Sequence, residues 1–133
     1  MRILVCGSRT WDNKEAIETR MYDQLTAAQK GYRDVRTGVP ELVFIHGAAS
    51  GADELCQEVV EDMHDDGHLW VAVQEFPAEW NKYGRAAGPI RNKQMLVEGR
   101  PEIVLAFWDG KSRGTANMIS QAKAAGVPVE IIR

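Results

Sequence analysis

The chain has 133 residues, of which 44% are hydrophobic and 26% are charged, with 16 Lys and Arg against 19 Asp and Glu. This length predicts one domain over residues 1–133, large enough to bury a core without disulfides. The net charge of −3 argues against bulk nucleic-acid binding through electrostatics. The two cysteines lie in apolar stretches without metal-ligand spacing, so we expect no metal site and a reducing compartment.

The longest apolar runs, such as 69–73 and 103–108, are too short to span a membrane. The first residues enter a strand-like run at once, which leaves no room for a signal peptide. We therefore expect a cytoplasmic protein without a membrane partner.

Five short apolar runs are predicted as strands. Most are rich in β-branched residues and show little alternation, which is typical of strands buried on both faces of a parallel sheet. The predicted strands are residues 3–6, 42–45, 69–75, 103–107 and 129–132.

Helices are predicted between the strands. Apolar residues recur at helical spacing over residues 17–28 and 52–63, a third helix is expected to begin at Pro89, and a fourth covers about 115–125. Residues 31–41 and 76–88 are predicted as surface loops, the second a candidate lid. This order predicts the α/β class: a Rossmann-like, doubly wound, mostly parallel five-stranded sheet with helices on both faces.

A Gly-Ser-Arg-Thr-Trp segment at 7–11 directly follows the first predicted strand. Gly7 lets the backbone approach a ligand, Ser8 and Thr10 offer hydroxyl groups, and Arg9 can pair with a phosphate or carboxylate. The same residues suit an ordinary strand-to-helix turn with one surface arginine. Taken alone, this segment leaves both interpretations open.

A segment of small residues, His-Gly-Ala-Ala-Ser-Gly-Ala-Asp at 46–53, follows the second predicted strand. A helix that begins at Ser50 or Gly51 would present its positively polarised N-terminus to a phosphate. Helix capping alone would explain Ser50 and Asp53, but it does not require so many small residues, so ligand binding is favoured. The binding candidates here are Gly47, Ala48, Ser50, Gly51 and Asp53.

A third segment, Ser-Arg-Gly-Thr-Ala-Asn at 112–117, is again a glycine loop that opens a predicted helix. Its candidates are Arg113, Gly114 and Thr115. Loops after the first and fourth strands would flank the point where the strand order reverses, which is the ligand crevice of a doubly wound sheet. The pair is stronger evidence for a site than either loop alone.

Basic residues gather in the segments that follow strands. Arg91 and Asn92 open the predicted third helix and are the favoured functional pair there. Tryptophans at 11, 80 and 108 lie near strand ends, where they would either stack on a base or anchor packing. Seven of the 16 basic residues fall in such segments and predict an anion site at one edge of the sheet: Arg9, Lys82, Arg85, Arg91, Lys93, Lys111 and Arg113.

Five motifs together resemble the SLOG superfamily, and within it the YspA/YpsA-related branch of small bacterial and phage proteins. They are GSRTW at 7–11, HGAASGAD at 46–53, FPAEW at 76–80, GPIRNKQM at 88–95 and SRGTANMI at 112–119. The resemblance implies a Rossmann-like fold with a pocket for nucleotides or nucleotide-derived ligands. The superfamily also includes the DNA-processing protein DprA and the cytokinin-activating phosphoribohydrolases, which cut the base from a ribose 5′-monophosphate.

One departure from the phosphoribohydrolase pattern concerns catalysis. Those enzymes carry a Pro-Gly-Gly-x-Gly-Thr-x-x-Glu signature whose Glu is catalytic, whereas this chain keeps the Gly-Thr pair at 114–115 and has Met118 at the Glu position. Arg91 still resembles the catalytic arginine of that family. The catalytic residues therefore stay unknown, with Arg91, Glu79 and Asp53 as candidates.

The leading hypothesis is a sensor or sequestering protein for a nucleotide-like small molecule of ADP-ribose or NAD type, with no cofactor. The alternative is a nucleoside 5′-monophosphate phosphoribohydrolase with Arg91 as its phosphate clamp. Single-stranded DNA binding after the DprA precedent is less favoured because the chain is acidic. Inhibition of a host protein and assembly into a homo-oligomer are left open by the sequence.

Overall fold

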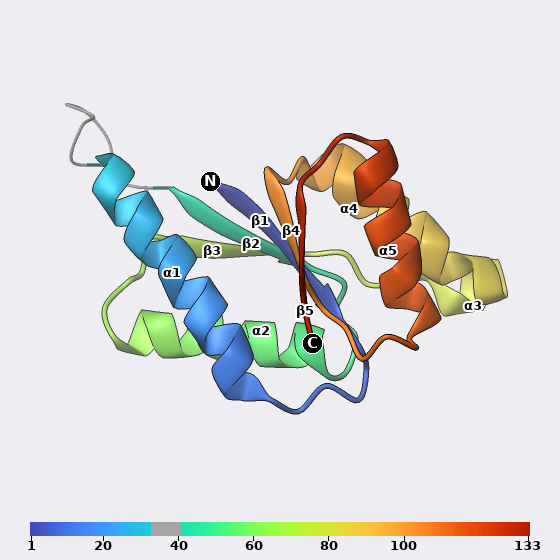
Figure 1. Ribbon diagram of the computed structural model, residues 1–133, viewed down its shortest axis with the longest axis horizontal. Helices are drawn as coiled ribbons and strands as arrows, with labels where there is room; N and C mark the ends of the chain where they lie inside the picture. Colours follow the sequence, from blue (N-terminus) through green and yellow to red (C-terminus); the bar gives the residue numbers. More distant parts are fainter. Residues whose placement is uncertain (33–40) are drawn as a thin grey trace.

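Five parallel strands form the centre of the molecule. The computed structural model describes residues 1–32 and 41–133, and its strands form one sheet in the order β3-β2-β1-β4-β5 (Figure 1). The strands are β1 (Arg2–Gly7), β2 (Leu42–His46), β3 (Val71–Glu75), β4 (Ile103–Phe107) and β5 (Val129–Ile132). Every neighbouring pair is parallel, so the predicted α/β class is confirmed.

Helices cover both faces of this sheet. Figure 1 shows α1 (Lys14–Tyr32) and α2 (Ala52–Asp65) on one side, and α4 (Ala87–Gly99) and α5 (Arg113–Ala124) on the other. Side chains alternate across β1: Ile3 and Val5 pack into the core beneath α1 and α2, and Leu4 packs into the core beneath α4 and α5. A central strand with two buried faces explains why its sequence is continuously apolar.

The segment before α4 differs from its prediction as a surface loop. It contains a one-turn helix, α3 (Trp80–Tyr83), and a 3-10 turn, η1 (Gly84–Ala86), which runs directly into α4 two residues before Pro89. Four-residue elements are too short to show helical periodicity in the sequence, which is why the prediction was wrong here. Figure 1 shows α3 at the outer end of α4, away from the sheet.

A smaller difference concerns the start of the third strand. The third strand begins at Val71, because Leu69 is 76% exposed and lies in the turn between α2 and β3. The predicted loop at 31–41 falls mainly on residues 33–40, which lie outside the described residues.

No helix within 1–32 or 41–133 combines the length and hydropathy that a membrane crossing requires.

The strand order places a crevice between β1 and β4. From β1 the chain continues to β2 and β3 on one side of the sheet, whereas β4 pairs with β1 on the other, with Gly7 in register with Phe107. The loops that leave these two strands therefore diverge at their carboxyl ends. This arrangement confirms that the loops after the first and fourth strands flank the reversal of strand order.

Candidate functional site

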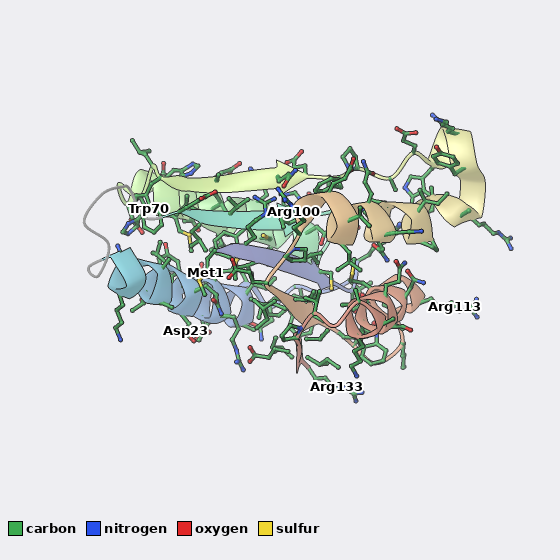
Figure 2. All side chains as sticks on the ribbon, turned by 90° about the horizontal axis from the view of Figure 1, so that it is seen from above. Met1, Asp23, Trp70, Arg100, Arg113 and Arg133 are labelled. Atoms are coloured by element: carbon green, nitrogen blue, oxygen red, sulfur yellow. The ribbon has the colours of Figure 1, made fainter. Side chains whose placement is uncertain are left out.

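A cleft of about 320 Å³ lies where these loops diverge. Its walls come from β1 and the loop after it, the start of α2, α3 with the turn that follows, α4, and the start of α5. Figure 2 shows Arg113 at the start of α5, at the same end of the molecule as α3, and Met1 away from it. The cleft therefore occupies the carboxyl edge of the sheet, where ligands bind in doubly wound folds.

The structure brings most of the predicted binding residues to one place. Eight of them line the cleft: Gly7, Arg9, Asp53, Arg91, Asn92, Arg113, Gly114 and Thr115. Gly47, Ala48 and Ser50 line an adjoining hollow of about 250 Å³ that also has Arg9 and Arg91 in its wall. The remaining three, Ser8, Thr10 and Gly51, occupy other positions.

Ser8 and Gly51 hold the loop after β1 against its neighbours. Ser8 is 1% exposed, and its Oγ accepts a hydrogen bond of 3.1 Å from the backbone N–H of Asp109, in the loop after β4. Its carbonyl oxygen accepts the N–H of Ala52 at 3.3 Å. Gly51 packs directly beneath this loop, where a Cβ would lie 2.3 Å from that carbonyl oxygen. Both residues therefore fix the position of the loop after β1, which forms part of the cleft, without lining the cleft themselves.

Thr10 lies beside Trp11 and Asp109 at a separate hollow of about 140 Å³. Trp11 packs edge-on against Phe107 with ring centroids 5.6 Å apart, and Trp108 donates its indole N–H to the carbonyl of Ser112 at 3.0 Å. These two tryptophans therefore have packing roles.

Arg91 is the most constrained cation of the cleft. Its Nη1 donates to the carbonyl oxygen of Gly47 at 2.6 Å, and its Nε donates to Oδ1 of Asn92 at 3.1 Å. Burial lowers the pKa of Arg91, an effect opposed by the nearby Asp53 carboxylate and reinforced by Arg9. The guanidinium is thus held in one orientation against the wall of the cleft.

Asn92 connects this arginine to α5. It is 4% exposed, and its Nδ2 donates to the carbonyl oxygen of Gly114 at 3.2 Å and to Oδ1 of Asn117 at 3.0 Å. The amide oxygen accepts from Arg91, so one side chain uses both ends of its amide. Asn92 therefore fixes the position of Arg91 relative to the N-terminus of α5.

Asp53 is the only carboxylate among the residues that line the cleft. It is 6% exposed, and its Oδ2 accepts hydrogen bonds from the backbone N–H groups of Gly47 at 3.1 Å and Ala49 at 3.2 Å. Its Oδ1 is buried and has no hydrogen-bond partner among the described residues. Burial raises the pKa of Asp53, against the opposing effects of these amides, His46 and Arg91.

The backbone of residues 47–49 is held by side-chain acceptors on both sides. Nδ1 of His46 accepts the N–H of Ala48 at 3.0 Å, between the two N–H groups that Asp53 accepts. Nε2 of the same ring lies 2.9 Å from Oε1 of Gln57 on α2. Ala48 has a positive φ of 55°, a conformation that these contacts sustain.

The N-terminus of α5 faces the cleft without a side-chain cap. Ser112 precedes the helix and makes no capping hydrogen bond. Asp109 instead accepts the N–H groups of Lys111 and Ser112, each at 2.8 Å, which shapes the approach to the helix. The amides of the first helical turn, at residues 113–115, and the positive end of the helix dipole together suit an anion.

The lining residues outside the predicted binding set include Trp80, Arg85 and Asn117. Of these, Trp80 was already a candidate for stacking on a base and Arg85 a member of the predicted anion site. Trp80 has the guanidinium of Arg9 5.2 Å from its ring centroid. Two of the three come from α3 and η1, whose presence the sequence pattern does not reveal. Asn117 ends the segment at 112–117, one helical turn after Gly114, and that spacing was the available signal for it.

The catalytic candidates are divided by the fold. Arg91 and Asp53 line the cleft together, with Met118 in the same wall. Glu79 lies instead on a hollow of about 240 Å³ beside Lys82, 3.9 Å from that ammonium group. Within the described residues, no three His, Cys, Asp or Glu side chains converge in a way that would hold a metal ion.

Comparison with known proteins agrees with this architecture. No solved structure gives a significant match. The Gene 61 protein of Mycobacterium phage D29 is 32% identical over 128 residues, which cover 96% of this chain and 93% of the phage protein. Residues 1–83, which contain β1 to β3 and the first two glycine segments, match the YspA, cpYpsA-related SLOG family, named YAcAr. The chain belongs to this YspA, cpYpsA-related SLOG family.

Proposed function

We propose that this protein binds a nucleotide or nucleotide-derived ligand, such as one of ADP-ribose or NAD type, in the cleft, and that it senses or sequesters that ligand. One observation carries the proposal: four arginines and one carboxylate line a cleft that also receives the uncapped N-terminus of α5. The arginines are Arg9, Arg85, Arg91 and Arg113. Such an excess of positive charge in a chain of net charge −3 favours an anionic ligand.

The phosphate is expected at the start of α5. There the amides of residues 113–115 point out of the helix, and Arg113 stands at its first position. Arg91 is already oriented by Gly47 and Asn92, so its charge is available without further loss of side-chain entropy. The volume of about 320 Å³ falls within the range of roughly 300–1,000 Å³ that small-molecule sites occupy.

The base is expected near Trp80. This ring is 46% exposed at the rim of the cleft, and it offers a flat surface on which any nucleobase can stack. Arg9 already lies against the ring, so it can contact both the base and a phosphate.

Calorimetric titration of the purified protein with AMP, ADP-ribose, NAD and a cyclic nucleotide tests the proposal. We expect at least one to bind, and we expect Arg113→Ala to weaken it about 10- to 100-fold through loss of a charged hydrogen bond. Arg20→Ala is the matched control, because Arg20 pairs with Glu130 on the surface and does not line the cleft. Absence of heat at millimolar concentrations of all four would refute the proposal.

Hydrolysis of an N-glycosidic bond is the second candidate. It is favoured by Arg91 and the buried carboxylate of Asp53 in one cleft, since a carboxyl group of raised pKa can act as a general acid. Incubation with nucleoside 5′-monophosphates and chromatography of the products decides the question. Release of free base that Arg91→Ala abolishes would establish the enzyme, and intact nucleotide after prolonged incubation would exclude it for these substrates.

A further inference from the structure

The unpaired oxygen of Asp53 carries an inference about which ligand the cleft selects. We propose that Asp53 Oδ1 accepts a hydrogen bond from a sugar hydroxyl, so that the cleft prefers a ribonucleotide to its deoxy analogue. This inference rests on the proposed function and adds the identity of the sugar to it.

The two oxygens of this carboxylate have different surroundings. Oδ2 accepts hydrogen bonds from the N–H groups of Gly47 and Ala49, and these two bonds hold the backbone of residues 47–49 in place. Oδ1 is buried, without a partner among the described residues, in a side chain that lines the cleft. A buried acceptor left unpaired is costly, and such groups in proteins nearly always have a partner. Because Asp53 is a lining residue of the cleft, the inferred partner is a ligand bound there.

The partner must be a neutral donor. A carboxylate oxygen only accepts hydrogen bonds, and it repels a phosphate. A cationic donor is disfavoured because Arg9 and Arg91 line the same cleft. Hydroxyl and amino groups of the ligand remain, and the exposed Trp80 ring at the rim offers the base a separate place. The inferred donors to Asp53 are therefore the sugar hydroxyls.

Asp53 also gives the cleft a direction. The sequence predicts phosphate binding at the starts of both α2 and α5, but Asp53 places a carboxylate at the second position of α2. By contrast, α5 begins with Arg113 and has no acidic residue in its first turn. A ligand with phosphate at one end and hydroxyls a few bonds away thus has one favourable orientation, with its phosphate at α5 and its sugar at Asp53.

Calorimetry with AMP, 2′-deoxy-AMP and 3′-deoxy-AMP on the full chain tests this inference. We expect AMP to bind at least about tenfold more tightly than one of the two deoxy analogues, as loss of a hydrogen bond to a charged group predicts. In Asp53→Asn, the amide oxygen can still accept the N–H groups of Gly47 and Ala49, but the charge is gone. We expect this variant to lose most of the preference while binding the disfavoured deoxy analogue as well as the wild type does.

Glu54→Gln is the matched control. It removes the same charge one residue along α2 from an exposed position, so the preference for AMP should persist in it. A purely structural role of Asp53 would weaken binding of all three nucleotides equally in Asp53→Asn.

The remaining outcomes are also decisive. Equal affinity of the wild type for AMP and both deoxy analogues would overturn the inference and leave nucleotide binding intact. Binding of ADP-ribose or NAD without binding of AMP would likewise overturn the inference and leave nucleotide binding intact. Failure of every nucleotide to bind would overturn the proposed function itself, and the inference with it.

Discussion

Replacement of Gly51 by Ala tests whether the close contact between α2 and the loop after β1 is as tight as the structure has it. Gly51 precedes the first residue of α2 with φ 76° and ψ −123°, a region that residues with a Cβ rarely enter. A Cβ at this position would lie 2.3 Å from the carbonyl oxygen of Ser8 and 2.5 Å from the carbonyl carbon of Arg9. Both obstacles are backbone atoms, which cannot move aside as the end of a side chain can.

The expected cost has two parts. The unfavourable φ and ψ contribute about 1–3 kcal/mol, and the overlap with backbone adds about 1–3 kcal/mol, as overpacking of a well-packed region does. The two parts sum to about 2–6 kcal/mol, and we take about 3 kcal/mol, in the lower half of that range. With an unfolding entropy of about 2.1 cal/mol/K for each of the 133 residues, it corresponds to a fall in Tm of about 10 °C.

Urea and thermal unfolding, followed by circular dichroism, measure this effect. Gly126→Ala is the matched control, because Gly126 has the same φ of 76° but no atom within 4 Å of an added Cβ. It should therefore show only the cost of a Cβ at a positive φ, about 1 kcal/mol. If Gly51→Ala lowers the free energy of unfolding no more than Gly126→Ala does, α2 does not pack as tightly against the loop after β1 as the structure has it.

Three further predictions concern the cleft itself. Gly47→Ala would place a Cβ 2.2 Å from Nη1 of Arg91, so it should displace the guanidinium and weaken nucleotide binding in calorimetry by about tenfold or more with little effect on the Tm. Asn92→Ala removes three hydrogen bonds of a buried amide and should lower the free energy of unfolding by about 1–3 kcal/mol in urea titration. Because burial raises the pKa of Asp53 above its usual value of 3.8, the folded state holds this proton more tightly than the unfolded state. The tighter binding of this proton therefore stabilises the folded state fully below pH 3.8, and this contribution is lost as the pH rises through the folded pKa. Over that interval the wild type should lose stability relative to Asp53→Asn, which urea titrations at stepped pH measure.

The sheet and the position of the cleft could be predicted from the sequence because both depend on strong local patterns. Continuous apolar runs bounded by glycine loops predicted the five strands, and all five exist, with β4 and β5 at the predicted residues. Parallel strands joined by helices have few permitted connections. The loops at 7–11 and 112–117 were thus expected at the reversal of strand order, and residues of both line the cleft.

The parts that the sequence did not reveal depend on contacts between distant segments. Ser8 was predicted to face a ligand, but its hydroxyl accepts from Asp109, 101 residues away. Trp80 and Arg85 were candidates for base stacking and anion binding, but the sequence did not show that they share the cleft with Arg91, because they reach it through short helical turns without periodicity. The unpaired oxygen of Asp53 follows from the direction of one carboxylate relative to the loop at 47–49, and no sequence pattern encodes such a direction.

The distribution of charge in α2 bears on the choice between a small anionic ligand and a nucleic-acid strand. Asp53 lines the cleft, whereas Glu58 and Asp62 do not line it and contact Lys14 of α1. The acidic surface therefore adds to the net charge of −3 without entering the site. A nucleotide confined to about 320 Å³ would experience mainly the four arginines. Four of the 16 basic residues thus line one small cleft beside a single carboxylate, and this local excess of positive charge favours a small anionic ligand.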